Sequence, residues 1–287
     1  MPNPSTILIT GATDGLGRAL AKRLAQDGEA LILHGRDSDR LARVAEELDA
    51  IEEAPGVRTL VADLAELAQV RRLAEEVRET TDRLDVLVSN AGIGSGEPDG
   101  RERRTSADGY ELRFAVNFLA GFLLTLELLP LLRASAPARI VNVASLGQYP
   151  LDFDDLMLER GYDGSRAYAQ SKLAQIMAGF ELASRVPAGE VTVNSLHPAT
   201  YMPTKMVLEE IGRQVDSIED GVAATHRLVS DPALAGTTGA FFDRMREARA
   251  HPQAYDPEAR AELWRRATEL VGLPSDPELR RSEVPSP

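Results

Sequence analysis

Tyr168 and Lys172 have the residue types and the spacing to act together as an acid/base pair. They lie within residues 166–186, which have helical character, and residues four apart in a helix share one face. A tyrosine with an ordinary pKa of about 10 is a poor proton donor or acceptor at neutral pH, whereas a neighbouring ammonium favours the phenolate and lowers that pKa. The Tyr-x-x-x-Lys pattern is also common among surface residues, so its interpretation depends on the rest of the chain.

A second pair of the same kind stands just before the first. Tyr162 is followed four residues later by Arg166. Arginine cannot give up its proton, and the position of Tyr162 is not securely helical. We therefore favour Tyr168 with Lys172 as the acid/base pair.

A glycine-rich turn near the N-terminus has the context of a dinucleotide-binding loop. Residues 6–10 form a short apolar run that predicts a strand, and residues 18–26 have helical periodicity. Between them stand Gly11, Gly15 and Gly17, with the spacing Gly-x-x-x-Gly-x-Gly rather than the commoner Gly-x-Gly-x-x-Gly. Such glycines let the backbone approach a pyrophosphate, and the helix that follows supplies N–H groups and a positive dipole.

Predicted strands and helices alternate along the rest of the chain. The alternation predicts an α/β fold with a doubly wound, parallel, seven-stranded Rossmann-type sheet, helices on both faces, and ligands at the C-terminal edge of the strands. The further strands are predicted at 30–34, 57–62, 84–88, 139–145, 190–196 and 239–242, and the further helices at 37–51, 67–80, 108–132, 166–186, 221–230 and 257–271.

The domain organisation follows from composition. No Pro/Gly/Ser-rich linker divides the middle of the chain, so we expect a single domain over residues 1–273. Residues 274–287 are rich in proline, serine and charge, which predicts a flexible tail. The loops at about 94–104, 146–165 and 200–218 would form the substrate pocket, the last of them as a lid.

Arg36 follows the second predicted strand, where an NAD-binding chain would place an acid to hold the ribose hydroxyls. A guanidinium there suits a 2′-phosphate and Gly35 leaves room for it, so we expect NADP, with NADPH preferred over NADH. The alternative is a solvated surface arginine. Asp37 is better explained as a helix cap, and Asp63 could accept from an adenine amino group or cap the next helix.

Further polar and small residues follow the other strands. Ser145 ends the strand at 139–145, where active-site side chains of such sheets gather. Asn117 lies in an apolar stretch of the helix at 108–132, so it is either a satisfied core residue or part of a polar relay. The small residues at 90–92 fit either a backbone that passes close to a cofactor or a plain turn.

With these motifs in this order, the chain resembles the short-chain dehydrogenase/reductase family over roughly residues 5–272. It is closest in pattern to the retinol-dehydrogenase-like branch, because of the extended connection before Tyr168, the continuation at 171–173 and the ending at 239–272. The resemblance has two departures: Ser89 precedes Asn90 where the family has a doubled Asn, and Ala199 follows Pro198 where the family has Gly. The second departure bears on the path of the loop more than on the chemistry.

The resemblance implies hydride transfer between NADP(H) and a carbonyl or alcohol carbon. Tyr168 would exchange a proton with the substrate oxygen, and Ser145 would hydrogen-bond that oxygen and stabilise its developing charge. Lys172 would lower the pKa of Tyr168 and hold the nicotinamide ribose, and Asn117 would anchor a water that connects Lys172 to solvent. The cofactor-binding residues implied are Thr10, Gly11, Thr13, Asp14, Gly15, Leu16, Gly17, Arg36, Asp63, Leu64, Asn90, Ala91, Gly92, Tyr168, Lys172, Pro198 and Thr200.

Composition narrows the remaining classes of function. A formal net charge of -13 argues against nucleic acid or an anionic membrane surface as the principal partner, and the absence of cysteine excludes disulfides and thiolate sites. The four histidines show no metal-ligand spacing, so we expect no metal site. The N-terminus has no basic region before a long apolar run, and the apolar stretch at 118–132 is too short to span a bilayer comfortably. We therefore expect a soluble, cytoplasmic protein.

The leading hypothesis is an NADP(H)-dependent ketoreductase or alcohol dehydrogenase for an apolar or partly apolar small molecule. One alternative is a catalytically silent NADP-binding scaffold or regulator, although such proteins usually lose the Tyr or the Lys. Another is an epimerase or dehydratase with the same pair, which the glycine spacing and the lack of a large C-terminal substrate domain disfavour. By resemblance, the helices at 108–132 and 166–186 would form the interface of a homodimer or homotetramer.

Overall fold

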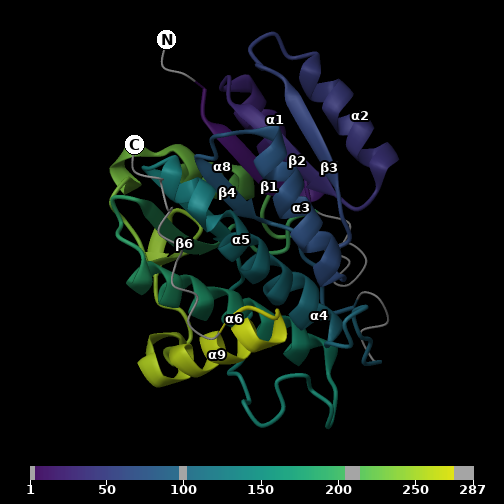
Figure 1. Cartoon of the computed structure of the whole chain (residues 1–287), viewed down its shortest axis with the longest axis vertical. Helices are drawn as coiled ribbons and strands as arrows, with labels where there is room; N and C mark the ends of the chain where they lie inside the picture. The colour runs from purple at the N-terminus through teal and green to yellow at the C-terminus, as the bar shows by residue number, and fades with distance from the viewer. Residues whose placement is uncertain (1–3, 97–101, 204–213, 275–287) are drawn as a thin grey trace, which may run out of the picture.

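An eight-stranded sheet forms the middle layer of the molecule (Figure 1). The computed structural model describes residues 4–96, 102–203 and 214–274. The strand order in this part of the chain is β3-β2-β1-β4-β5-β6-β7-β8, parallel from β3 to β7, with β8 antiparallel to β7. The strands are β1 Thr6–Thr10, β2 Ala30–Gly35, β3 Val57–Val61, β4 Val86–Ser89, β5 Ala138–Val143, β6 Val191–His197, β7 Phe241–Asp243 and β8 Arg246–Ala248.

Helices cover both faces of this sheet. One core joins it to α1, α2 and α8, and the other joins it to α3, α5, α6 and α9. Along β1, Ile7 and Ile9 belong to the first core and Leu8 to the second, because successive side chains of a strand point to opposite faces. The helices are α1 Gly15–Gln26, α2 Ser38–Asp49, α3 Leu67–Thr80, α4 Leu112–Phe114, α5 Ala120–Ala134, α6 Gly164–Arg185, α8 Ile218–Ser230 and α9 Pro257–Leu270, with a π-helix η1 at Ala115–Leu119 and 3-10 turns η2 at Pro232–Leu234 and η3 at Pro252–Tyr255.

The predicted fold class is confirmed, and the seven predicted strands are the seven parallel ones. The sequence does not predict β8, because its three residues have no apolar alternation and are largely exposed. A turn at Arg244, whose φ is +52°, brings β8 back along β7. The additional strand therefore comes from the turn and not from a buried face.

One continuous helix runs from Leu112 to Ala134 through α4, η1 and α5. It begins later than the predicted residue 108, because the chain turns at Gly109 and Glu111 accepts a hydrogen bond from the backbone N–H of Phe114 at 2.7 Å. With 23 residues the whole helix is long and apolar enough, by length and composition, to cross a membrane, although the stretch at 118–132 alone is short for that. However, 67% of its most apolar window is buried inside the fold, as in the core helix of a soluble protein.

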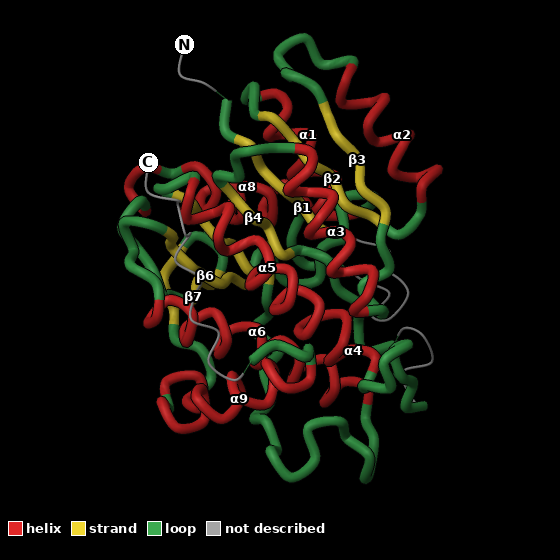
Figure 2. The backbone as a smooth tube through the Cα atoms, viewed as in Figure 1, coloured by secondary structure: helices red, strands yellow, loops and turns green. Residues whose placement is uncertain are grey.

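The connection between β5 and α6 is a long loop, as predicted, and lies beyond α4 and α6 at the bottom of the view (Figure 2). It ends where Asp163 caps α6 by accepting from the backbone N–H of Arg166 at 2.7 Å. The predicted loop at 94–104 and the predicted lid at 200–218 lie partly outside the described residues, and so does the predicted tail.

α9 covers the outer side of α6 (Figure 1). Its Trp264 is almost fully buried, and its ring lies edge-on to Phe122 of α5 with a centroid distance of 5.0 Å. The guanidinium of Arg185 on α6 lies 4.6 Å from the centre of the Trp264 rings. α6 is therefore enclosed by the sheet on one side and by α9 on the other.

Candidate active site

The glycine turn after β1 packs directly against the loop after β4. A side chain on Gly11, whose φ is +67°, would lie 2.8 Å from Cα of Ala91, so only glycine allows this approach. A side chain on Gly17 would lie 2.2 Å from the carbonyl oxygen of Gly11, so only glycine fits at this position in the first turn of α1. Asp14 caps α1 by accepting from the N–H of Gly15 at 2.7 Å.

Two polar side chains join the turn to β4. The hydroxyl of Thr10 accepts from the backbone N–H groups of Asn90 and Ala91 at 3.0 and 3.1 Å. The amide of Asn90 donates to the carbonyl oxygens of Thr10 and Gly11 at 2.9 and 3.1 Å. The structure thus brings together the N-terminal turn and the residues around Asn90, which the sequence predicts as one cofactor-binding edge.

Lys172 and Asn117 meet beside Gly92. A side chain on this glycine would lie 3.2 Å from Oδ1 of Asn117 and 3.5 Å from Nζ of Lys172. Lys172 is only 5% exposed and donates to the carbonyl oxygen of Val143 at 2.8 Å. Burial lowers the pKa of Lys172 to about 8, because a charged ammonium is poorly solvated inside the fold. Lys172 is therefore an amine that can change charge close to neutral pH.

Ser145 and Tyr168 meet beside another glycine. A side chain on Gly147 would lie 3.5 Å from Oγ of Ser145 and 3.9 Å from Cε1 of Tyr168. The same hydroxyl accepts from the N–H of Gly147 at 3.0 Å, and Nζ of Lys172 lies 5.9 Å from the centre of the Tyr168 ring. Ser145 follows β5, whereas Tyr168 and Lys172 lie one turn apart on α6, so two elements supply the hydroxyl, the phenol and the ammonium.

Asn117 lies in η1, the π-helical part of the long helix, and ties that helix to its surroundings. Its amide donates to the carbonyl oxygen of Ile93 at 3.1 Å and to Oγ of Ser171 at 3.0 Å, and its oxygen accepts from the N–H of Ile93 at 2.8 Å. The buried amide is therefore satisfied, as one of the two alternatives expects, and it contacts Ser171, the residue before Lys172.

Basic side chains gather beside the glycine turn. Arg36 is exposed at the end of β2, as expected, and Asp37 caps α2 by accepting from the N–H of Arg40 at 3.0 Å. A side chain on Gly35 would lie 2.6 Å from Thr13, so the strand end is as close to the turn as the backbone allows. A hollow of about 240 Å³ beside the turn is lined by Thr13, Asp14, Arg18, Arg40, Arg43 and Val44.

The other predicted cofactor residues lie at the same strand ends. Asp63 is exposed after β3 and accepts from the N–H of Ala65 at 2.9 Å, so it holds a turn and does not cap α3, which begins after Glu66. Leu64 is in the core. Pro198 is buried after β6, and the next predicted residue is Thr200, whose hydroxyl accepts from Arg244 at 2.8 Å.

Sequence reasoning did not single out Arg113 and Glu111. Arg113 donates to the hydroxyl of Tyr162 at 2.6 Å, and that hydroxyl donates to Glu111 at 3.0 Å. Tyr162 is therefore a partner of this buried pair and not of Arg166. The sequence has one signal for Arg113: it stands four residues before Asn117 on the same helix, so the two side chains share a face.

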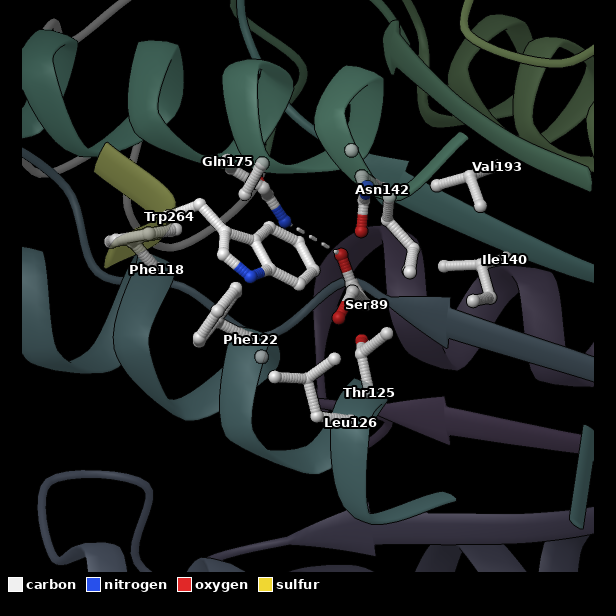
Figure 3. A pocket seen from close by; sticks show the side chains of 14 residues that line it. Ser89, Phe118, Phe122, Thr125, Leu126, Ile140, Asn142, Gln175, Val193 and Trp264 are labelled. Atoms are coloured by element: carbon white, nitrogen blue, oxygen red, sulfur yellow. Dashed lines mark hydrogen bonds between the residues drawn. The ribbon is translucent and has the colours of Figure 1, made fainter. Parts of the chain in front are cut away.

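A small pocket lies between α5 and α6 (Figure 3). Figure 3 shows Trp264 reaching into it from α9, beside Gln175, whose amide nitrogen donates to the carbonyl oxygen of Ser89 at 3.4 Å. Within the described residues, neither Oε1 of Gln175 nor Nε1 of Trp264 has a hydrogen-bond partner. A free volume of about 30 Å³ admits roughly one or two waters. This pocket is thus too small for an organic substrate.

Comparison with known proteins identifies the family. The family model described as short chain dehydrogenase matches residues 5–212. The chain is a short-chain dehydrogenase/reductase. This short-chain dehydrogenase is 37% identical to human Retinol dehydrogenase 14, over 93% of this chain and 86% of that protein. It is 34% identical to Retinol dehydrogenase 13 of Mus musculus, over 93% of this chain and 84% of that protein, so it belongs to the retinol-dehydrogenase-like branch.

Proteins other than retinol dehydrogenases are also similar to this chain. The short-chain dehydrogenase is 35% identical to the putative daunorubicin C-13 ketoreductase DnrU of Streptomyces sp., over 93% of this chain and 92% of that protein. Among solved structures, it matches the Pseudomonas aeruginosa RhlG/NADP active-site complex with a TM-score of 0.66 and 28% identity, over 83% of this chain and 94% of that chain. The protein is thus an NAD(P)-dependent enzyme of a class that acts on alcohol and carbonyl groups.

Proposed function

We propose that this enzyme transfers hydride between NADP(H) and the carbonyl or alcohol carbon of an apolar or partly apolar small molecule. The observation that carries the proposal is the meeting of Ser145, Tyr168, Lys172 and Asn117 around two glycines at the C-terminal edge of the sheet. Ligands of doubly wound sheets bind at this edge.

The residues divide the chemistry among themselves. A bound nicotinamide would supply or accept the hydride, and the protein would supply position and electrostatics. In the reducing direction Tyr168 donates a proton to the substrate oxygen while Ser145 donates a hydrogen bond to the same oxygen. Lys172, as an ammonium, stabilises the phenolate that Tyr168 leaves behind. Asn117 keeps α6 and the loop after β4 in register through Ser171 and Ile93.

The basic residues beside the glycine turn support NADP, with NADPH preferred over NADH. Arg36 and Arg40 lie where the end of β2 and the start of α2 approach the turn, and their guanidinium groups suit a 2′-phosphate. Arg40 is held only loosely, at 3.9 Å from Asp14, whereas Arg18 is engaged by Glu47. Arg36, which has no ion pair within the described residues, and the loosely held Arg40 are therefore our candidates for this phosphate.

Arg36→Ala tests this cofactor assignment. We expect NADPH to bind about 10-fold to 100-fold more weakly, because a charge-assisted contact worth roughly 1.5–3 kcal/mol is lost. NADH binding should change by less than about twofold, since NADH has no 2′-phosphate. Fluorescence titration with both cofactors measures the difference. Arg78→Ala serves as the control, because Arg78 lies on α3, far from the glycine turn. Equal weakening of both cofactors would contradict the assignment.

Apolar side chains support an apolar substrate. Leu146 and Tyr149 are exposed just after Ser145, and Tyr201 is exposed just after β6, which neighbours β5 in the sheet. Large apolar groups that remain exposed near a site favour an apolar ligand. The printed names of relatives, which include Polyprenol dehydrogenase of Mus musculus as well as the retinol dehydrogenases, are consistent with such a substrate.

A panel of ketones and aldehydes that differ in apolar length tests the function directly. We expect oxidation of NADPH, followed by its absorbance, with kcat/KM rising along the panel as apolar length increases. Tight binding of NADPH without turnover of any carbonyl or alcohol would favour the catalytically silent scaffold instead.

Two further expectations belong to this proposal. We propose a cytoplasmic protein, because the apolar helix at Leu112–Ala134 is mostly buried in the core. We also propose a homodimer or homotetramer, but α9 covers α6, so an interface on this side would have to involve α5 and α9. Sedimentation velocity of the intact chain measures the oligomeric state.

A further inference from the structure

Arg113, Glu111 and Tyr162 form a buried polar cluster beside the active site. The side chain of Arg113 is 0% exposed and that of Glu111 is 1% exposed, with 3.8 Å between the two. The phenol of Tyr162 connects them, because it accepts from Nη1 of Arg113 at 2.6 Å and donates to Oε1 of Glu111 at 3.0 Å. Buried charges persist when they are paired and hydrogen-bonded, so this cluster has a defined geometry.

Arg113 also holds the loop that follows β4. Its Nε donates to the carbonyl oxygen of Gly94 and its Nη2 to that of Ser95, each at 2.7 Å. The preceding residue, Ile93, is held by Asn117 through both its N–H and its carbonyl oxygen. Arg113 and Asn117 are four residues apart in one helix and share a face. Two side chains of one helix thus fix three consecutive residues beside the catalytic cluster.

The same region holds the loop that precedes α6. Tyr162 belongs to this loop and stands six residues before Tyr168. Earlier in the loop, the carbonyl oxygen of Met157 accepts from Nε of Arg103 at 2.8 Å, and that of Leu156 accepts from the amide of Gln170 at 2.8 Å. The loop is therefore attached to the chain before α4 and to α6.

We infer that Arg113 is a positioning residue for the proposed reaction: through Gly94, Ser95 and Tyr162 it fixes the two loops that border the substrate side of the site relative to each other. The phenol of Tyr162 is the joint between the loops, and Glu111 fixes its orientation. The inference rests on the proposed function, because a substrate that reaches Ser145 and Tyr168 would lie against these loops.

Tyr162→Phe tests the inference with the smallest change. The variant keeps the ring and loses only the hydroxyl, so the loop before α6 is no longer attached to Arg113. We expect KM for the best carbonyl of the panel to rise about 10-fold, which corresponds to about 1.4 kcal/mol. Turnover at saturation and the Kd of NADPH should stay within about twofold, because no group that touches the reacting atoms has changed. Unchanged KM would overturn the inference.

Tyr110→Phe is the matched control. Tyr110 is also partly buried, and its hydroxyl donates at 2.8 Å to the carbonyl oxygen of Leu270 at the end of α9, not to either of the two loops. The control loses a phenol hydrogen bond of the same kind but should leave KM unchanged. An equal rise of KM in Tyr110→Phe would show that general loosening, and not positioning, explains the effect.

Amide hydrogen exchange separates this inference from the proposed function. In Tyr162→Phe we expect faster exchange in peptides that cover residues 93–96 and 156–163, with unchanged exchange in peptides that cover β1 and α1. This result needs no substrate, so it stands even if the wild-type protein turns over no carbonyl. Unchanged exchange in both loops would overturn the inference. Arg113→Lys extends the test, since lysine keeps the charge but cannot reach Gly94, Ser95 and Tyr162 together.

Discussion

Two tyrosines six residues apart, each near a cation, have opposite surroundings in this enzyme. Tyr168 lies on α6 one turn from Lys172, beside the Ser145 hydroxyl. Tyr162 lies in the loop before α6, and its hydroxyl is engaged by Arg113 and Glu111. The same side chain therefore occurs once at a glycine-lined edge of the site and once in a closed polar cluster.

The difference teaches that the neighbouring cation and the solvation decide the role of a tyrosine. Burial and the charge of Glu111 raise the pKa of Tyr162 to about 12, so this phenol stays protonated at any physiological pH. Burial lowers the pKa of Lys172 to about 8, whereas arginine remains charged. Only the Tyr168 surroundings contain a cation whose charge can change near neutral pH, which suits proton transfer.

The largest expected effect is the loss of activity when the Tyr168 phenol is removed, compared with removal of the Tyr162 phenol. Tyr168→Phe should lower kcat/KM for carbonyl reduction by about 1,000-fold, because positioned general acids contribute roughly 100-fold to 10,000-fold. Tyr162→Phe should keep kcat within about twofold. Initial rates of NADPH oxidation measure both variants side by side. Retention of wild-type kcat by Tyr168→Phe, or a comparable loss of kcat in Tyr162→Phe, would break the comparison.

Lys172→Met sharpens the comparison between the two tyrosines, because it should change both activity and stability. We expect kcat to fall by about 100-fold, because the phenolate of Tyr168 loses its cation. The depression of the Lys172 pKa from 10.5 to about 8 means that the folded state holds the charged amine at a cost of about 3 kcal/mol at pH 7. The variant should therefore unfold at higher urea concentration than the wild type at pH 7.

The pH dependence gives the sign of that stability effect. Between about pH 8 and 10.5 the folded protein has lost the proton of Lys172 while the unfolded chain still holds it, so the stability of the wild type rises with pH relative to the variant. Urea unfolding of both proteins at pH 7 and at pH 10 measures the gap. A gap that does not narrow would show that Lys172 is better solvated than its burial indicates.

Much of the fold follows from the sequence because its signals are local. The predicted helix at 67–80 matches α3, and the strand at 6–10 matches β1, since apolar periodicity and turn residues mark both. Asp37 is a helix cap, as expected from its type and place. The strand β8 has no such signal, because its pairing depends on a turn and an edge that other parts of the chain create.

The site follows from the sequence only as far as its motifs reach. The glycine turn, Ser145 and the Tyr168–Lys172 pair carry recognisable spacing, and parallel strands bring their ends to one edge. The engagement of Tyr162 by Arg113 joins residues 49 apart in the chain, and no periodicity connects them. The burial of Lys172 likewise depends on the packing around α6, so its lowered pKa could not be anticipated from the Tyr-x-x-x-Lys pattern.

The smallest expected effect concerns the stability that the Tyr162 phenol provides. Tyr162→Phe should cost about 1–3 kcal/mol at pH 7, because Arg113 and Glu111 each lose a hydrogen bond to the same hydroxyl. A raised pKa in the folded state means that this contribution is fully present below about pH 10 and is lost as the pH rises through about 12. Urea unfolding of wild type and variant at pH 7, 9 and 11 should therefore give nearly the same difference at the first two and a smaller one at the third. A difference that stays constant up to pH 11 would mean that Tyr162 ionises in the folded state as easily as an exposed tyrosine, and the contrast with Tyr168 would then rest on position alone.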